Sequence, residues 1–226
     1  MKVLVFLDSL VSAPRYIRLF DTKVSFVVTG RGSFNNLFIE VLRIFRRKEF
    51  KAGFAIIMLW IRKRVYFSES GLSTPDCLSF IKRLQPEIAL HAMGVIYPRA
   101  VIDLCGLGIL NAHIGKLPEF RGRSVMEWSL FIGGQTGVTV FFIDEGIDTG
   151  SPIVLFHPVD ISNCVDISDA KRKLFDMAPN LYADALSLVG EGSSFFSNDL
   201  SQGYRYYEMS TLFRDALESG VFNHSL

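Results

Sequence analysis

The apolar run VLVFL occupies residues 3–7, and a second run, VSFVV, follows at residues 24–28. Between them, Tyr16, Leu19 and Phe20 recur at helical spacing. A short, continuous apolar run is typical of a strand that is buried on both faces of a parallel sheet. The two runs and their connection therefore predict that the chain starts with a β-α-β unit.

The rest of the chain repeats this alternation of strand and helix. Further strands are expected at residues 65–67, 88–90, 108–113, 138–143 and 153–156. Helices are expected at residues 74–84, 124–132 and 166–189, and two more within residues 37–64 that divide around residues 50–53. Pro179 should kink or split the long helix at residues 166–189.

This pattern predicts an α/β protein with a Rossmann-like, mostly parallel sheet, helices on both faces and a short C-terminal aromatic tail. The predicted main domain covers residues 1–190, and residues 191–226 are predicted to form a linker and the tail. In such a sheet, the ligand site lies at the carboxyl ends of the strands.

The composition is that of a globular protein with almost balanced charge. The 24 Lys and Arg and 23 Asp and Glu give a net charge of +1, which argues against a nucleic-acid partner held mainly through phosphates. The basic segments around Arg46 and Lys63 are predicted to be solvated helix faces. Residues 54–61 are apolar but too few for a membrane span, so we expect a helix half-buried on the sheet, with peripheral membrane contact as the alternative.

The three cysteines, Cys77, Cys105 and Cys164, are widely spaced and include no CxxC pair. This pattern predicts neither a metal site nor a disulfide framework. It favours a reduced, cytoplasmic setting.

Polar side chains follow apolar strands at two places. Residues two apart in a strand point to the same side, so Asn111 and His113 are expected to project together. Asp148 follows the next strand, between glycines that indicate a tight loop. Taken singly, each has a plainer interpretation, as a hydrogen-bonded structural residue or a turn aspartate. Together, at the carboxyl ends of parallel strands, they are candidates for catalysis.

The sequence NAHIGKLPEFRG at residues 111–122 resembles the signature of the folate-dependent formyltransferases, in which Asn-x-His leads into a Leu-Pro turn and an Arg-Gly pair. The segments GVT at 137–139 and GIDTG at 146–150 resemble the second motif of that family, at the family's separation. The resemblance extends, less sharply, over residues 1–156. Gly115-Lys116 replaces a more frequent Ser-Leu pair, which we expect to alter the surface of the turn more than its shape.

The resemblance implies that 10-formyltetrahydrofolate, as co-substrate, donates its formyl group to a primary amine without a metal ion. Asn111 and a protonated His113 would stabilise the oxyanion of the tetrahedral intermediate, and Asp148 would hold the imidazolium and relay protons. His91 is expected to be structural. The backbone would bind the pterin ring at Val95, Ile96, Tyr97, Ile143, Asp144 and Glu145.

The resemblance indicates the acceptor amine less directly. Residues 7–11 lack the glycine-rich phosphate loop of the members that act on glycinamide ribonucleotide. The segment after residue 156 is expected to be too short for the C-terminal barrel-like domain of the methionyl-tRNA enzymes. The layout instead resembles enzymes that formylate an amino sugar on a nucleotide carrier. Hydrolysis of formyltetrahydrofolate is the alternative from another class, although its known relatives carry an N-terminal regulatory domain that we do not expect here.

Guanidinium groups and aromatic rings suit the phosphates and base of a nucleotide. Contacts to such an acceptor are expected from Arg121, Arg123, Trp128, Tyr204 and Tyr206. The aromatic tail has two other interpretations that stay open, as a docking segment or as the seam of a homodimer.

Overall fold

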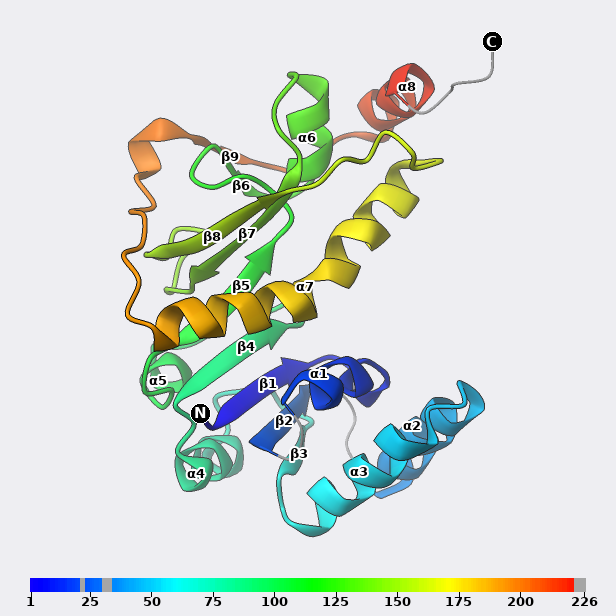
Figure 1. Cartoon of the computed structure of the whole chain (residues 1–226), viewed down its shortest axis with the longest axis vertical. Helices are drawn as coiled ribbons and strands as arrows, with labels where there is room; N and C mark the ends of the chain where they lie inside the picture. Colours follow the sequence, from blue (N-terminus) through cyan, green and yellow to red (C-terminus); the bar gives the residue numbers. More distant parts are fainter. Residues whose placement is uncertain (21–22, 30–33, 222–226) are drawn as a thin grey trace. The chain divides into compact units, whose positions relative to one another are not determined.

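The computed structural model of the chain describes residues 1–20, 23–29 and 34–221, without the side chains of residues 34–36 (Figure 1). A mostly parallel, seven-stranded sheet with the order β3-β2-β1-β4-β5-β7-β8 is surrounded by helices, which confirms the predicted α/β fold. The chain forms two compact units, Met1–Leu110 and Asn111–Leu226. The predicted division into a domain of residues 1–190 and a linker with a tail at residues 191–226 is a different one, and it stays a prediction.

The first unit contains the apolar strands that the sequence predicts. They are β1 (Val3–Leu7), β2 (Val24–Thr29), β3 (Val65–Ser68) and β4 (Ile88–Ala92). Strand β1 pairs in parallel with both β2 and β4, and all five of its residues are buried. A strand that is covered on both faces needs no polar alternation, which explains the continuous run.

The helices of the first unit connect these strands. They are η1 (Leu10–Ser12), α1 (Ala13–Phe20), α2 (Phe34–Arg46), α3 (Phe50–Ile61), α4 (Pro75–Leu84) and α5 (Arg99–Ile102). Helix α4 begins where the sequence predicts, because the Thr74 hydroxyl accepts a hydrogen bond from the Cys77 N–H at 3.4 Å.

The division between α2 and α3 lies at residues 47–49, earlier than the predicted division at residues 50–53. Gly53 lies inside α3, and its lack of a side chain allows the close approach of α2. A Cβ at this position would lie 2.0 Å from the Phe45 ring. The glycine therefore serves helix packing rather than helix termination.

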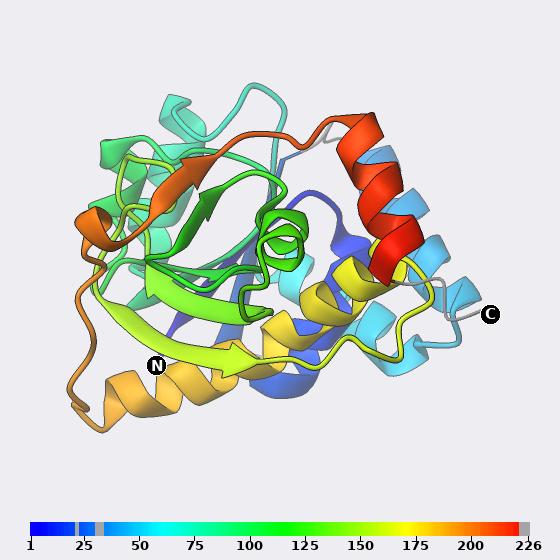
Figure 2. The same cartoon turned by 90° about the horizontal axis from the view of Figure 1, so that it is seen from above.

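The second unit completes the sheet with strands β5, β7 and β8, and it adds a small parallel sheet of β6 and β9 (Figure 2). Strand β8 pairs antiparallel with β7. The strands are β5 (Ile109–His113), which starts in the first unit, β6 (Phe120–Gly122), β7 (Gly137–Phe142), β8 (Ile153–Pro158) and β9 (Tyr204–Tyr206). The sequence predicts neither β6 nor β9 as a strand.

The helices of the second unit are α6 (Val125–Phe131), α7 (Ile167–Gly190), η3 (Leu200–Gln202) and α8 (Thr211–Val221). Helix α7 continues through Pro179, so the proline does not split it, although its ribbon changes direction near the middle (Figure 1). A proline inside a helix removes one backbone hydrogen bond and bends the axis. Within the described ranges, no helix combines the length and apolar character that a membrane crossing requires.

Candidate active site

The three catalytic candidates all lie in the second unit, at two strand ends. Asn111 and His113 are the third and last residues of β5, and Asp148 lies in the loop between β7 and β8. The backbone of Asp148 is left-handed, with φ of 54°. Aspartate tolerates this conformation better than most residues, so the loop can turn its carboxylate toward β5.

His113 is buried, and both of its ring nitrogens face acceptors. Nε2 lies 2.8 Å from the carbonyl oxygen of Phe120, and Nδ1 lies 3.5 Å from Oδ1 of Asp148. A carbonyl oxygen can only accept, so Nε2 carries a proton. Nδ1 can donate to the carboxylate only when the ring carries a second proton, and the geometry therefore suits an imidazolium paired with Asp148.

Gly115 lies directly against the His113 ring. A Cβ on Gly115 would lie 2.9 Å from Nε2 of His113 and 3.0 Å from a methyl group of Val125. A side chain at this position would therefore meet the His113 ring, while the expectation that the Gly115-Lys116 pair alters the surface of the turn more than its shape stays a prediction. A serine here, as is common in the resembled signature, would require the imidazole or α6 to shift.

The Asp148 carboxylate and its loop are held from two sides. Oδ2 accepts the N–H of Gly122 at 2.9 Å. The side-chain amide of Asn198 donates to the backbone oxygens of Asp148 and Gly150, at 3.1 and 2.9 Å. The buried Oδ1 of Asn198 has no hydrogen-bond partner among the described residues.

Sequence reasoning missed Asn198 because it lies in the stretch expected to be a linker. Neighbouring backbone atoms explain its position, since Phe196 exchanges two hydrogen bonds with Ile153, at 2.8 and 3.0 Å. A single asparagine in a stretch rich in serine carries no sequence signal that distinguishes it from other loop residues.

The two sequence motifs are joined physically by Thr139. Its hydroxyl donates to the carbonyl of Gly115 at 2.6 Å and accepts the N–H of Leu117 at 3.1 Å. The turn that follows His113 is therefore fixed by a residue of β7, so the two motif segments contact each other in the folded chain.

Asn111 is half-buried, and its side-chain amide makes no hydrogen bond within the part of the chain that the structure describes. The next residue, Ala112, donates its N–H to the hydroxyl of Tyr182 in α7 at 2.9 Å. The backbone of β5 is therefore anchored while the Asn111 amide stays able to bind a ligand.

The predicted pterin-binding segments belong to different units. In the first unit, Val95 and Ile96 are exposed, and Tyr97 is buried with its hydroxyl 3.0 Å from Nδ1 of His91. His91 thus has a structural partner.

In the second unit, Ile143 is half-buried, while Asp144 and Glu145 are exposed at the start of the β7–β8 loop. Oδ1 of Asp144 accepts from the Gly146 N–H at 2.9 Å and from the Thr149 hydroxyl at 2.7 Å. The Asp144 carboxylate is therefore engaged in shaping the loop. Pterin binding by either segment stays a prediction.

The predicted acceptor-binding side chains gather around β6 and β9. Arg121 donates to the carbonyls of Leu200 and Gly203, at 3.1 and 2.9 Å, and Trp128 donates to the carbonyl of Tyr207 at 2.8 Å. These contacts attach the tail to the second unit.

The remaining predicted acceptor residues differ in exposure. Tyr206 stacks on Phe120 with ring centroids 5.4 Å apart. Arg123 forms a 3.1 Å ion pair with Glu208, and both side chains are exposed. Tyr204 is also exposed. Binding of an acceptor by these five residues remains a prediction.

The three cysteines are free and buried. Burial raises the pKa of the Cys105 thiol to about 12 and that of Cys77 to about 11. Groups of three or more His, Cys, Asp or Glu side chains arranged for a metal ion do not occur among the described residues.

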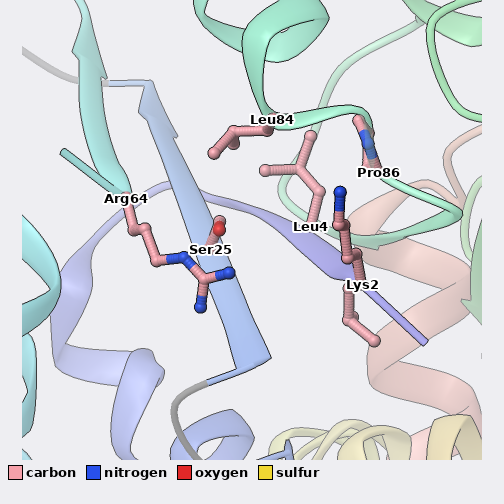
Figure 3. Close-up of a pocket in the computed structure, with 7 residues that line it drawn as sticks. Lys2, Leu4, Ser25, Arg64, Leu84 and Pro86 are labelled. Atoms are coloured by element: carbon pink, nitrogen blue, oxygen red, sulfur yellow. The ribbon is translucent and has the colours of Figure 1, made fainter. Parts of the chain in front are cut away.

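The first unit has a small pocket at the opposite strand ends from those that carry a ligand in such sheets (Figure 3). Lys2, Leu4 and Ser25 line it near the starts of β1 and β2, together with Arg64 and Pro86. Because ligands of open α/β sheets bind at the carboxyl ends, this pocket is not part of the candidate active site.

The formyl transferase family model matches residues 35–186 of the chain. Methionyl-tRNA formyltransferases of Clostridioides difficile and Bifidobacterium longum are 31% identical over 116 residues and 30% identical over 141 residues. These matches cover 50% and 62% of this chain but 37% and 43% of the relatives, so the matched part spans less than half of their length.

Solved formyltransferase structures share the fold at low sequence identity. A sugar N-formyltransferase from Shewanella sp. is 16% identical with a TM-score of 0.63, over 100% of this chain and 89% of that chain. Phosphoribosylglycinamide formyltransferase from Bacillus halodurans is 17% identical with a TM-score of 0.59, over 85% and 97% of the chains.

A third structure carries ligands. The formyltransferase PseJ from Anoxybacillus kamchatkensis, in complex with UDP-4,6-dideoxy-4-formamido-L-AltNAc and tetrahydrofolate, is 16% identical with a TM-score of 0.53, over 92% and 86% of the chains. At such identities these likenesses concern the fold. The family model, in contrast, covers well over half of this chain and includes Asn111, His113 and Asp148, so the chain belongs to the formyl transferase family.

Proposed function

We propose that the chain transfers the formyl group of 10-formyltetrahydrofolate to a primary amine, and that this amine belongs to an amino sugar on a nucleotide carrier. One observation supports formyl transfer above all: Nδ1 of His113 lies 3.5 Å from the Asp148 carboxylate. His113 also follows Asn111 by two residues on the same strand, β5. In acyl transfer to an amine, an amide and an imidazolium can stabilise the oxyanion, and a carboxylate can move the proton.

In the proposed reaction, the amine nitrogen bonds to the formyl carbon, and a negative charge develops on the formyl oxygen. The half-buried side-chain amide of Asn111, which forms no hydrogen bond with another described residue, donates to that oxygen. His113 donates through Nε2–H once this group leaves the Phe120 carbonyl, which it contacts in the structure. Preorganised donors of this kind are worth about 3–4 kcal/mol of barrier each.

Collapse of the intermediate breaks the bond between the formyl carbon and the folate nitrogen. The attacking amine loses a proton to Asp148, and Asp148 returns this proton, directly or through water, to the folate nitrogen as it leaves. Asp148 is the base that accepts the amine proton, directly or through water, because its carboxylate is held by the Gly122 N–H and faces His113.

Two features support an amino sugar on a nucleotide as the acceptor. The likeness to the Shewanella sugar N-formyltransferase extends over the whole chain, including the tail. In that tail, Tyr204 exposes its ring, and the guanidinium of Arg205 lies 5.4 Å from the ring centre of Tyr207. Exposed tyrosine and arginine side chains suit a base and a diphosphate.

Methionyl-tRNA is the second candidate acceptor. It is favoured by the sequence relatives quoted above, which are methionyl-tRNA formyltransferases. Glycinamide ribonucleotide is a weaker candidate, because the segment after β1 lacks the glycine-rich phosphate loop.

The test incubates the purified chain with 10-formyltetrahydrofolate and, separately, UDP- and dTDP-linked amino sugars, glycinamide ribonucleotide and methionyl-tRNA. Mass spectrometry of the acceptor detects the gain of a formyl group. We expect it on an amino-sugar nucleotide, and no gain with His113→Asn. Formylation of methionyl-tRNA alone would replace the proposed acceptor. Formate release at the same rate without any acceptor would replace transfer by hydrolysis.

A further inference from the structure

Helices α2 and α3 lie side by side and expose an apolar surface that the candidate active site does not use (Figure 1). The exposed fractions reach 62% for Phe54 and 59% for both Phe38 and Ile61. We call this surface the apolar stripe, and it consists of Phe38, Leu42, Phe50, Phe54, Met58 and Ile61.

The stripe follows the helical repeat. On α3, Phe50, Phe54, Met58 and Ile61 are separated by four, four and three residues, so they share one face. The opposite face, which includes Ile56, is buried. Helix α3 is therefore apolar on two sides, of which the fold covers one.

The parts of the stripe on the two helices are continuous. The ring of Phe45 on α2 lies 5.7 Å from that of Phe50 and 5.4 Å from that of Phe54. This contact is possible because Gly53 brings the helices together. On α2, Phe38 and Leu42 are four residues apart and extend the same surface.

Basic side chains border the stripe. Residues 34–64 include eight Lys and Arg and only two Asp and Glu, whereas the whole chain has a net charge of +1. Both acids are paired within the first unit, Glu40 with Arg43 at 2.7 Å and Glu49 with Arg18 at 2.8 Å. Lys51 on α3 and Arg62 at its C-terminal cap are exposed beside the stripe and have no acidic partner among the described residues.

We propose that α2 and α3 dock on an anionic lipid bilayer, with both helices lying in the plane of the interface. An amphipathic helix with bulky apolar residues on one face and Lys or Arg beside it is the pattern that binds such surfaces. The apolar stripe would enter the boundary between headgroups and acyl chains, and the basic border would contact anionic headgroups.

Other occupants fit this surface less well. A nucleic acid would engage the basic border through its phosphates but would leave the phenylalanines and Met58 exposed to water. A second copy that paired through the same face would bring two basic borders together. The bilayer satisfies both the apolar and the charged part. Docking is independent of the formyl-transfer proposal.

Vesicle flotation tests the apolar part with the full chain. Vesicles of phosphatidylcholine with about one third phosphatidylglycerol should retain the protein, and vesicles of phosphatidylcholine alone should retain much less. The double substitution Phe54→Ser and Ile61→Ser should lower the partition coefficient at least about tenfold. The control is Phe175→Ser in α7, a phenylalanine outside the stripe that is 54% exposed, and this change should leave partitioning unchanged.

A second pair of variants tests the charged part. Lys51→Gln with Arg62→Gln should weaken binding to the anionic vesicles by roughly thirtyfold, and the control pair Lys2→Gln with Lys82→Gln should not. Absence of wild-type binding to anionic vesicles at low salt would overturn the proposal.

Two other results would also overturn it. RNA binding in a mobility-shift assay that is lost on substitution of Lys51 and Arg62, but not of Phe54 and Ile61, would indicate a nucleic-acid surface. Conversion of a dimer to a monomer by the Phe54 and Ile61 substitutions, measured by sedimentation without any vesicle binding, would indicate a contact between copies.

Discussion

Gly122 contacts both the tail and the candidate active site. We therefore expect Gly122→Ala to lower the stability of the protein, weaken the attachment of the tail and disturb the position of Asp148. Its φ of 102° lies in the region that L-residues rarely adopt. A Cβ would lie 2.2 Å from the backbone oxygen of Tyr206, which cannot rotate away as a side chain would. The same glycine donates its N–H to Asp148.

The expected loss follows from these contacts. The positive φ alone costs an alanine about 1–2 kcal/mol. Relief of the clash requires β6 and β9 to separate, which breaks the Arg123 N–H to Tyr206 O bond (3.0 Å) and the Tyr204 N–H to Glu119 O bond (3.2 Å). Each such bond contributes about 0.5–1.5 kcal/mol, so the total is roughly 2–5 kcal/mol.

Gly133→Ala is the matched control, since Gly133 also has a positive φ, of 72°, but no atom lies within 4 Å of the added Cβ. Urea unfolding monitored by circular dichroism should show a loss of about 1–2 kcal/mol for this control. Limited proteolysis should cleave the tail of the Gly122 variant selectively. Equal stability of the two variants, with equal resistance of the tail, would refute the assignment of β6–β9 pairing.

The remaining predictions concern catalysis, loop support, acid–base behaviour and acceptor binding. Under the proposed function, His113→Asn or Asp148→Asn should reduce turnover at least about a hundredfold while the far-ultraviolet spectrum stays native; near-normal turnover would exclude them as the acid–base pair. Asn198→Asp replaces the amide donor by an acceptor that faces two carbonyl oxygens, so it should lower the free energy of unfolding by about 1–3 kcal/mol. It should lower kcat by a larger factor than it changes KM. An unchanged kcat would argue that Asn198 does not support the Asp148 loop. Burial raises the Cys105 pKa from 9.0 to about 12, so folded protein keeps a proton that unfolded chain loses. This contribution to the free energy of unfolding is fully present below pH 9 and is lost as the pH rises toward 12. At pH 8, iodoacetamide should label Cys105 in the folded protein about a thousandfold more slowly than in the unfolded chain. Tyr204→Ala should raise the KM for the acceptor by about fivefold or more at unchanged stability, because the ring is exposed and stacking on a base is worth about 1–3 kcal/mol; an unchanged KM would remove Tyr204 from the acceptor site.

The strands and helices that the sequence predicts correctly have local causes. Strand β1 is a continuous apolar run because it is buried on both faces, and helix α4 starts at a Thr-Pro-Asp cap signal. The candidate trio was predicted from two motifs, and the structure brings His113 and Asp148 to 3.5 Å. In each case, the residues whose pattern predicted the strand, the helix start or the site are the same residues that form it in the structure.

The features that the sequence did not predict depend on partners far along the chain. Strands β6 and β9 have three residues each, too few for a periodic pattern, and each exists because the other lies beside it. Asn198 and Tyr182 contact the site region across 50 and 70 residues, to Asp148 and Ala112. Such contacts leave no local trace in composition or spacing.

The contacts of the tail also narrow the choice of acceptor-binding residues. Arg121, Trp128 and Tyr206 were predicted to bind the acceptor because they offer a guanidinium and two aromatic rings, but in the structure each is engaged in holding the tail. Arginine that donates to two carbonyls cannot present the same nitrogen to a phosphate without releasing them. Substitution of any of these three would therefore change stability together with binding. The Tyr204 side chain is exposed, so its removal should leave the attachment of the tail to β6 intact. Among the predicted residues, Tyr204 is therefore the best position at which to test acceptor binding without disturbing the tail.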